Sequence, residues 1–577
     1  MSAAGLPPRP VLLWHTLRHL PPAQLAWLLR RRLLPRTRPR RIGAATLRTP
    51  VHGLRTCPPP LPELPPGQIV FLNRARAFDP AQVDWRAAEM PKLWRYNLHY
   101  FDFLHWPCWS AAQKSALIDG WIRANSPAQG DGWEPYPVAL RAVNWLKWWF
   151  AGTAAPDPAH CASLAAQLDW LARNLEFELR ANHLLKNACA LIWGGLCLET
   201  PRAARWLRSG LTLLLREADE QFLADGGHFE RSPMYHALAL QDLLEVLALA
   251  DALGDAAIPA AARARLAAQA GRALRFFATL CGPAQRLPLF NDAAQGIAPA
   301  PAELIAYGQR VLGSGALAAG FAHGTGAFEL PATGYWGLHT AAQRLVIDCG
   351  PVGPDYQPGH AHCDTLSFEL DVGGVPVIVD AGVHDYEDSE MRRYVRSTAA
   401  HNTLRVDGAE QSEIWGAFRV ARRARPCAVE FHCDESGRLR FRGAHDGYQR
   451  LPGAVRHQRE ILVEGDRSWR IDDALEGRGR HRLESFLHFH PAVRLNAGAG
   501  GAFHAEAPGG LRLRLVPHGF DECHIERGWH CPEFGRREAN AVLIGTASGE
   551  LPLRCGFGVV RDSTYFQGRS PIRGAFT

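Results

Sequence analysis

The sequence predicts a two-domain protein, with an all-helical first half followed by an all-β second half. Between about residue 94 and residue 320, segments such as LRAVNWLKWWFAG and LQDLLEVLALADAL place apolar residues at helical spacing. Beyond about residue 327, short alternating runs such as DTLSFELDV and VPVIVDAG indicate strands separated by Gly, Pro and Asp. A chain of 577 residues, 47% of them hydrophobic, is long enough to bury two cores.

We expect the helical domain to span residues 63–325. Helix follows helix there through short turns with Pro and Gly, which favours a layered or toroidal arrangement, an (α/α) toroid or incomplete barrel. Periodicity alone cannot close such a ring. Residues 326–577 show no helical pattern of useful length between the strands, so we expect an antiparallel β-sandwich there.

Residues 1–62 form a basic N-terminal extension, with eleven arginines and no Asp, Glu or Lys. Subtracting these eleven charges from the formal net charge of +7 leaves −4 for the remainder. Because the body lacks a basic stripe with interleaved aromatics, the composition argues against a nucleic-acid partner. The segment PPAQLAWLLRRRLLPRTRPRR is typical of a short amphipathic helix with a basic tail. It predicts either a weak contact with an anionic membrane surface or polymer, or an extension that simply packs on the body.

Targeting signals are not evident. The apolar stretch VLLWHTLRHL is interrupted by His15, Arg18 and His19, which is unlike a secretory signal. The thirteen cysteines are scattered and lack a CxxC pair, so they indicate neither a disulfide framework nor a cysteine zinc site. A cytoplasmic or membrane-associated location is favoured, and a periplasmic one stays open. The sequence does not address the oligomeric state.

The segment GHAHCDTLSFEL places His360, His362 and Asp364 at a turn that leads into a strand. Residues two apart on an extended chain share a face, so both histidines can point into one site. Asp380 and His401 follow in VPVIVDAG and RSTAAHNTL. Two imidazoles and a carboxylate suit a divalent ion such as zinc. The alternative is a set of surface or core histidines, because a chain with 25 histidines contains chance clusters.

Two polar clusters occur within predicted helices. RANHLLKNACAL places Asn182 and His183 where an apolar helical stripe begins, so Asn182 is also a candidate N-cap. EPYPVALRAVNW places Arg141 and Asn144 one helical turn apart and therefore on the same side. An exposed arginine at such a position is usually solvated.

A third polar cluster, DGGHFERSPMYHALAL, follows two glycines and precedes a helix. It contains Glu230, Arg231 and Tyr235. The alternative is an ordinary loop in which Ser232 caps the helix.

Taken together, these segments resemble the heparinase II/III family and its alginate-lyase-like relatives, in the family's order. The likeness begins at LWRYNLHYFDFL, continues through EPYPVALRAVNW, ANHLLKNA and GGHFERSPMYH, and ends with GHAHCDTLSFEL, VIVDAG and RSTAAHNT. It spans roughly residues 90–410. The resemblance implies an (α/α) toroid, then an antiparallel β-sandwich, with substrate held where the two meet.

The resemblance also implies a polysaccharide lyase that cleaves a uronate-containing polymer by β-elimination. Asn182 and His183 match the groups that face the uronate carboxylate, Tyr235 the catalytic tyrosine, and His360 the second proton-transfer residue. The further candidates for substrate contact are Arg141, Asn144, Glu230, Arg231, Tyr394 and Arg396.

A divalent metal is part of the same resemblance. His362, Asp380 and His401 match the family's ligands, with zinc as the first choice and manganese or calcium as alternatives. A metal at this place would hold the loop near His360 and orient its neighbours, rather than attack the substrate.

Two other functions compete with the lyase. The first is a non-catalytic polysaccharide-binding or assembly protein of an exopolysaccharide pathway, although binding alone does not need a paired tyrosine and histidine. The second is a metal-dependent glycoside hydrolase, which would need two carboxylates as acid and base. The matched motifs contain no such pair. The polymer stays open: a glycosaminoglycan, alginate or a bacterial exopolysaccharide.

Overall fold

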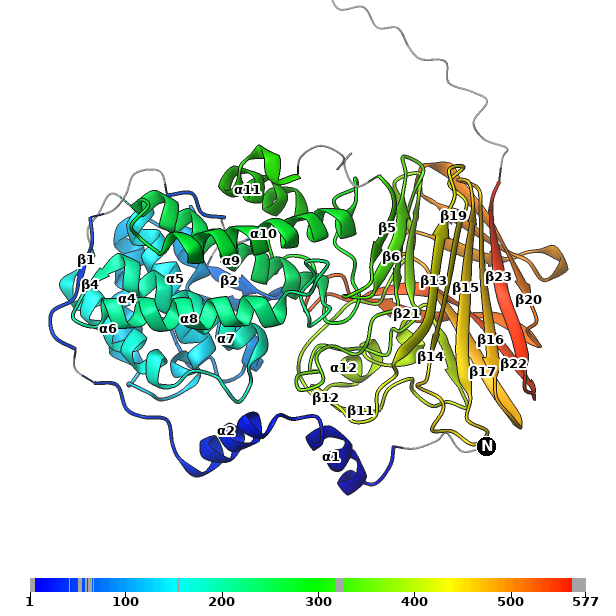
Figure 1. Cartoon of the computed structure of the whole chain (residues 1–577), viewed down its shortest axis with the longest axis horizontal. Coiled ribbons are helices and arrows are strands. Elements are labelled where there is room, and N and C mark those ends of the chain that lie inside the picture. The colour runs from blue at the N-terminus through cyan, green and yellow to red at the C-terminus, as the bar shows by residue number, and fades with distance from the viewer. Residues whose placement is uncertain are drawn as a thin grey trace, which may run out of the picture.

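The structure is a computed structural model that describes residues 6–562, except residues 41, 50–53, 58–59, 61–64, 66, 153–155 and 318–324. Its first half is helical and its second half is built of antiparallel strands, which confirms the predicted fold class (Figure 1). The helices of the first domain are α3 (Lys92–Tyr100), α4 (Ala111–Ala124), α5 (Pro135–Ala151), α6 (Pro158–Arg173), α7 (Ala181–Cys197), α8 (Ala203–Gln221), α9 (Pro233–Leu253), α10 (Ala260–Cys281) and α11 (Pro301–Leu312).

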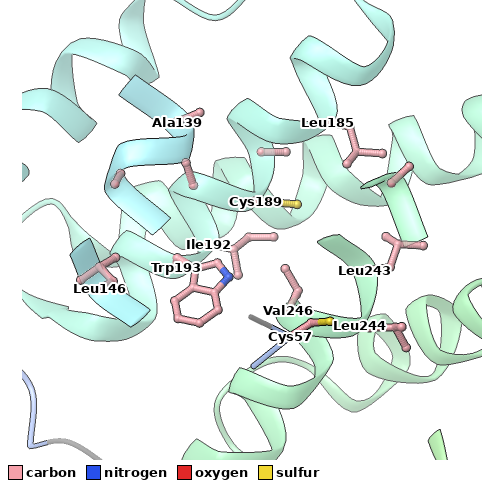
Figure 2. Close-up of a cluster of buried hydrophobic side chains, with 14 of the residues drawn as sticks. Cys57, Ala139, Leu146, Leu185, Cys189, Ile192, Trp193, Leu243, Leu244 and Val246 are labelled. Atoms are coloured by element: carbon pink, nitrogen blue, oxygen red, sulfur yellow. The ribbon is translucent and has the colours of Figure 1, made fainter. Parts of the chain in front are cut away.

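Close helix packing around α7 organises the helical domain. An added Cβ on Gly195 of α7 would lie 2.7 Å from the backbone nitrogen of Leu207 in α8. The two backbones therefore approach too closely for a larger residue at this crossing. On its other side, α7 meets α5 and α9, whose apolar side chains form one buried cluster (Figure 2). Ile192 and Leu243 are fully buried within it. This core fixes the start of α7 relative to the start of α9.

The β domain is a sandwich of two layers. A five-stranded sheet runs in chain order through β5 (Gly326–Leu330), β6 (Tyr335–His339), β7 (Gln343–Asp348), β8 (Phe368–Val372) and β9 (Val375–Ile378). A four-stranded sheet has the order β10 (Leu404–Val406), β17 (Arg480–His488), β22 (Glu538–Glu550) and β21 (Glu522–His530). A bridge between Ile378 and Phe489 connects these two sheets into one layer.

The second layer is an eight-stranded antiparallel sheet. Its order is β13 (Pro426–Cys433), β14 (Leu439–His445), β15 (Arg456–Glu464), β16 (Ser468–Glu476), β23 (Leu553–Arg561), β20 (Leu511–His518), β19 (Phe503–Ala507) and β18 (Arg494–Ala497). Along β15, buried and half-buried residues alternate, as expected for a strand with one face in the core. Trp336 and Phe441 from opposite layers pack at 5.7 Å between ring centroids. The core therefore lies between the layers.

The basic extension packs across both domains. Its helix α1 (Arg9–Leu17) lies beside β11 (Ile414–Gly416) and β12 (Arg419–Val420), and α2 (Pro22–Leu33) lies beside the helical domain (Figure 1). The indole of Trp415 donates to Thr16 Oγ1 at 3.1 Å. The guanidinium of Arg31 donates to the carboxylate of Glu178 at 3.0 Å. One side of each of these helices thus packs on the body.

The remaining described elements are short. Strand β1 (Thr46–Leu47) pairs with β4 (Leu198–Glu199), and β2 (Gln68–Phe71) pairs with β3 (Arg74–Ala77). Helix α12 (Glu390–Val395) lies in the loop region between β9 and β10. Within the described residues, every helix is too short or too polar to cross a bilayer. All thirteen cysteines are free thiols, as their scattered positions predict.

Candidate active site

The candidate site lies where the helical domain meets the β domain. Tyr235 is in the first turn of α9, and the side chain of Ser232 caps this helix by accepting from the backbone N–H of Tyr235 at 3.3 Å. The same hydroxyl donates to the backbone carbonyl of Asp292 at 2.6 Å. The capping role considered for Ser232 is therefore correct, and it fixes Tyr235 relative to the loop at Asp292.

Tyr235 and His360 meet across the domain junction. Their rings stack at 3.9 Å between centroids, with an interplanar angle of 30°. The hydroxyl of Tyr235 lies 3.1 Å from that of Tyr386. Burial and the neighbouring Tyr386 raise the pKa of Tyr235 well above its usual value, so its phenol is protonated at neutral pH. The predicted tyrosine and histidine are thus brought together.

The imidazole of His360 lies between two carboxylates. Its Nδ1 is 2.9 Å from Asp292 Oδ2, and its Nε2 is 3.4 Å from Glu230 Oε2. Asp292 is fully buried and also accepts two hydrogen bonds from the guanidinium of Arg392. Burial alone would raise the pKa of Asp292, but Arg392 and two imidazoles outweigh it and hold the pKa well below its usual range. An ionised Asp292 orients the His360 ring and accepts a hydrogen bond from its Nδ1–H group.

Asn182 and His183 lie at the start of α7, close to this pair. Asn182 is within the first turn rather than at the N-cap, which is Arg180, so the capping alternative for Asn182 is wrong. Its side-chain amide donates to Glu230 Oε1 at 3.0 Å. Glu230 therefore contacts both Asn182 and His360. His183 lies next along α7, with its ring 4.4 Å from that of Tyr136.

The pKa of His183 is raised above its usual value. Burial lowers it, but the carboxylate of Glu176, 3.1 Å from His183 Nδ1, more than compensates. A quarter of the His183 side chain is exposed (26%). His183 can therefore offer a proton or positive charge to an acidic ligand.

Three buried groups converge beside His360 in a set that could hold a metal. Ligand atoms of His362, Asp364 and His401 all lie within 4.8 Å of one another. His362 Nε2 contacts Asp292 and His401 Nδ1 contacts Asp380, at 2.9 and 2.8 Å. The other ring nitrogens, His362 Nδ1 and His401 Nε2, are buried without a hydrogen-bond partner. Unpartnered imidazole nitrogens beside a carboxylate fit a divalent cation.

The carboxylates near these histidines differ from the expected set. The structure groups Asp364, rather than the predicted Asp380, with His362 and His401. Burial, with a contribution from Asp380, raises the pKa of Asp364 to about 6, while His401 opposes the shift. Asp380 instead accepts from His401 and fixes its tautomer.

Two family models match the chain. The model described as "Heparinase II/III N-terminus" matches residues 158–302, and "Heparinase II/III-like, C-terminal" matches residues 322–559. The chain belongs to the heparinase II/III family. The matched ranges contain Asn182, Tyr235, His360 and the candidate metal set, so the site lies within the family's own domains.

The sequence relatives of this heparinase II/III member are not all named as lyases. A "Heparin-sulfate lyase" of Bacteroides stercoris is 28% identical over 256 residues, 40% of this chain and 36% of that protein. "FtsZ-localized protein C" of Caulobacter vibrioides is 25% identical over 376 residues, 63% of this chain and 59% of that protein. The match thus spans about a third of the length of the lyase.

Solved structures show the same fold. "Heparinase III" superposes with a TM-score of 0.64 at 16% identity, covering 82% of this chain and 76% of that chain. The heparan sulfate lyase from Pedobacter heparinus has a TM-score of 0.57 at 18% identity, with coverage of 84% and 79%. These likenesses support the two-domain architecture.

Two predicted substrate contacts are instead internal to the helical domain. Arg141 is fully buried and donates to the carbonyls of His99 and Gly132 at 3.1 and 2.8 Å. Asn144 is also buried and donates to the carbonyl of Tyr100 at 2.9 Å. Because their donors hold the backbone around α3 together, the substrate role predicted for these residues is not supported.

Three further predicted contacts have mainly structural partners. Arg231 donates to the carbonyl of Thr333 at 2.9 Å, which ties the helical domain to the turn between β5 and β6. Arg396 is buried and donates to the carbonyl of Ala361 at 3.0 Å, supporting the turn that contains His360. The hydroxyl of Tyr394 accepts from the backbone of Trp529 at 3.2 Å. Of the predicted substrate contacts, Glu230 alone directly contacts the predicted catalytic side chains in the described residues.

The sequence reasoning missed three residues of this site: Asp292, Tyr386 and Arg392. Asp292 contacts His360, His362 and Arg392 at once. Its only sequence signal is an Asn-Asp pair within the otherwise apolar stretch LPLFNDAAQG. Tyr386 lies in a loop and Arg392 in the short helix α12, and the polar sequence around them has no periodicity that would indicate their positions.

Proposed function

We propose that this protein is a polysaccharide lyase that cleaves a uronate-containing polymer by β-elimination. The observation that supports this most is the stack of Tyr235 on His360, which places a phenol and an imidazole together at the domain junction. Glu230 connects Asn182 to this pair, because it accepts from Asn182 and also contacts His360. His183 follows Asn182 at the start of α7. A proton acceptor, a proton donor and polar groups for an anion are the parts that such an elimination needs.

The substrate's carboxylate must be offset before its C5 proton can be removed. His183 is suited to this role because its pKa is raised, which favours the imidazolium. The amide of Asn182 is the neighbouring polar group. Preorganised donors of this kind stabilise the enolate-like charge that develops in the transition state.

His360 is suited to remove the C5 proton. Asp292 accepts from Nδ1, and this leaves Nε2 as the basic nitrogen. Tyr235 is protonated at neutral pH and can donate to the departing O4 oxygen. The C5–H and C4–O4 bonds break, the C4–C5 double bond forms, and one proton passes to His360 while another leaves Tyr235. The opposite assignment, in which Tyr235 acts as the base, uses the same pair. Each transfer contributes typically ~10² to 10⁴ in rate.

We also propose a divalent metal, zinc first, at His362 and His401. Asp364 is the carboxylate that the geometry favours as third ligand, and Asp380 orients His401. When bound, the ion would supply a fixed positive charge that holds the turn preceding β8. Asp292 contacts both His362 and His360, so fixing His362 would also hold the imidazole of His360 in place beside Tyr235.

The test is to offer purified protein a panel of polyuronates and to follow the ultraviolet absorbance of the C4–C5 double bond. The name of the Bacteroides relative makes a heparan-sulfate type of glycosaminoglycan the first substrate to try, with alginate and bacterial exopolysaccharides next. Unsaturated products that require both Tyr235 and His360 would support the proposal. New reducing ends without unsaturation would support a hydrolase instead.

A non-catalytic binding or assembly role is the second candidate. The observation behind it is that a relative not named as a lyase, FtsZ-localized protein C, is matched over 63% of this chain, against 40% for the Bacteroides lyase. In that case the protein would bind an acidic polymer without forming unsaturated ends. Tyr235→Phe would then leave the affinity unchanged and there would be no turnover to lose.

A further inference from the structure

Apolar exposure is concentrated at the N-terminal extension. Of the twelve large apolar side chains exposed in the described part of the chain, ten lie between Leu6 and Leu34. This segment contains α1 and α2, which lie along one side of the molecule (Figure 1). Large exposed apolar patches mark interaction sites more often than single exposed residues do.

Helix α1 turns one side to the protein and the other to solvent. Leu12 is buried, and Thr16, one turn later, accepts from the indole of Trp415. The exposed apolar residues lie on the remaining part of the helix surface, which faces solvent, and Trp14 is the most exposed of them at 66%. They are Val11, Leu13, Trp14 and Leu17.

Helix α2 repeats this arrangement on the helical domain. Gln24 is buried and donates to the carbonyl of Glu178 at 3.1 Å, and Arg31 reaches the same residue's carboxylate. The outward side has leucines four residues apart, which places them in one row. The row consists of Leu25, Leu29 and Leu33, and the last two are 59% and 68% exposed.

Positive charge surrounds the exposed apolar side chains of both helices. In the described residues of the extension, none of the exposed arginines forms an ion pair with a carboxylate, and residues 1–62 contain no acidic residue at all. The exposed arginines among these residues are Arg9, Arg18, Arg30, Arg32, Arg38, Arg40, Arg48 and Arg55, and the first four of them lie on or next to α1 and α2. Apolar side chains flanked by unpaired arginines are the pattern of helices that lie in an anionic membrane interface.

We propose that α1 and α2 form a membrane-docking face that binds an anionic phospholipid surface. The leucines and Trp14 would enter the headgroup region, and the arginines would contact lipid phosphates. A soluble polyanion would bind the arginines, but it would not bury the exposed leucines and Trp14. A second copy of the chain would bring the same positive charges together, which disfavours self-association through this face.

The experiment is flotation of the full-length protein with vesicles of phosphatidylcholine, with and without phosphatidylglycerol. We expect binding to the anionic vesicles, weakening at high salt, and little binding to phosphatidylcholine alone. The double variant Leu29→Ser/Leu33→Ser should reduce the partition coefficient by roughly ten-fold or more, because both side chains are on the outward row. Arg30→Gln/Arg32→Gln should reduce binding to anionic vesicles specifically.

The matched control is Val516→Ser, which changes an exposed apolar residue on β20 (39% exposed) far along the chain and should bind as the wild type does. Thermal unfolding confirms that each variant is folded. The proposal would be overturned if the wild-type protein failed to float with anionic vesicles, or if the leucine variant floated equally well. It would also be overturned by a dimer that the leucine variant abolishes, or by retention on a soluble polyanion with no vesicle binding.

Discussion

The ring of Tyr235, at the start of α9, stacks on the ring of His360, in the loop before β8, at 3.9 Å between centroids. One residue comes from the helical domain and the other from the β domain. The pair therefore exists only while the two domains are docked. Chemistry that needs both groups depends on the domain junction as much as on the residues themselves.

Tyr235→Phe should abolish formation of unsaturated product while leaving the stack on His360 in place. Only the hydroxyl is removed, so the loss isolates its proton transfer, and we expect a fall of at least ~10² in kcat. The readout is ultraviolet absorbance with the best polyuronate substrate. The matched control is Tyr386→Phe, which removes the partner 3.1 Å from the Tyr235 hydroxyl and should reduce the rate far less. Full activity in Tyr235→Phe would exclude the proposed role.

Arg392→Gln should destabilise the protein strongly. The change leaves the fully buried carboxylate of Asp292 without its guanidinium partner, and a broken buried pair costs about 3–5 kcal/mol. The control is the neighbouring Arg393→Gln, an exposed arginine paired with Asp388, which should cost less than about 1 kcal/mol. Chemical denaturation measures both. Equal effects of the two substitutions would show that Arg392 is not needed to compensate Asp292.

Elemental analysis should find about one divalent ion per chain, and removing it with a chelator should lower Tm. His362→Ala and His401→Ala should each lose the ion, whereas the exposed His504→Ala should keep it. Comparing Asp364→Asn with Asp380→Asn then identifies the carboxylate ligand. The larger loss of metal affinity should follow Asp364→Asn. A wild-type protein without metal, fully active and stable, would refute the metal proposal.

The fold class could be predicted because its signals are local. Helical spacing before about residue 320 and strand alternation after it are properties of short windows, and the domain change occurs between Leu317 and Gly326. The site depended on the order of several motifs along the chain. Spacing alone could not show that Asn182, Tyr235 and His360 converge, because their contacts cross the domain junction.

The incorrect and missed site residues have the same cause, because contacts made in the tertiary structure leave no local pattern in the sequence. Helix α5 is apolar on most of its surface, so its pattern does not reveal that Arg141 points inward to the carbonyls of His99 and Gly132. Asp292 and Arg392 are 100 residues apart and lie outside regular periodic patterns. A buried ion pair between such positions is a property of the tertiary structure.

The stability contributed by His183 should depend on pH. Its pKa in the folded protein is raised above 6.5 by Glu176, so the folded state binds the proton more tightly than the unfolded chain does. This contribution is complete below about pH 6.5 and is lost as pH rises through the raised pKa. The difference in unfolding free energy between wild type and His183→Gln should therefore shrink with rising pH. A difference that stays flat across this pH range would contradict the raised pKa assigned to His183.

Gly227→Ala should destabilise the domain junction, whereas Gly271→Ala should stabilise α10. An added Cβ on Gly227 would overlap Thr333 Oγ1 and lie 2.6 Å from the ring of Phe276. Thr333 is held there by Asp225, which accepts from its backbone N–H and hydroxyl at 2.8 and 2.7 Å, so it cannot retreat freely.

Overpacking of this kind costs about 1–3 kcal/mol, and it should also reduce turnover because Tyr235 and His360 approach from opposite sides of the junction. At Gly271 the added Cβ would meet only Arg275, at 3.6 Å, so the gain of helix propensity should stabilise by about 0.5–1 kcal/mol. Denaturation and turnover measured on both variants separate the two effects. If Gly227→Ala lowered neither the free energy of unfolding nor the turnover, the inference that a Cβ at Gly227 cannot be accommodated next to Thr333 would be wrong.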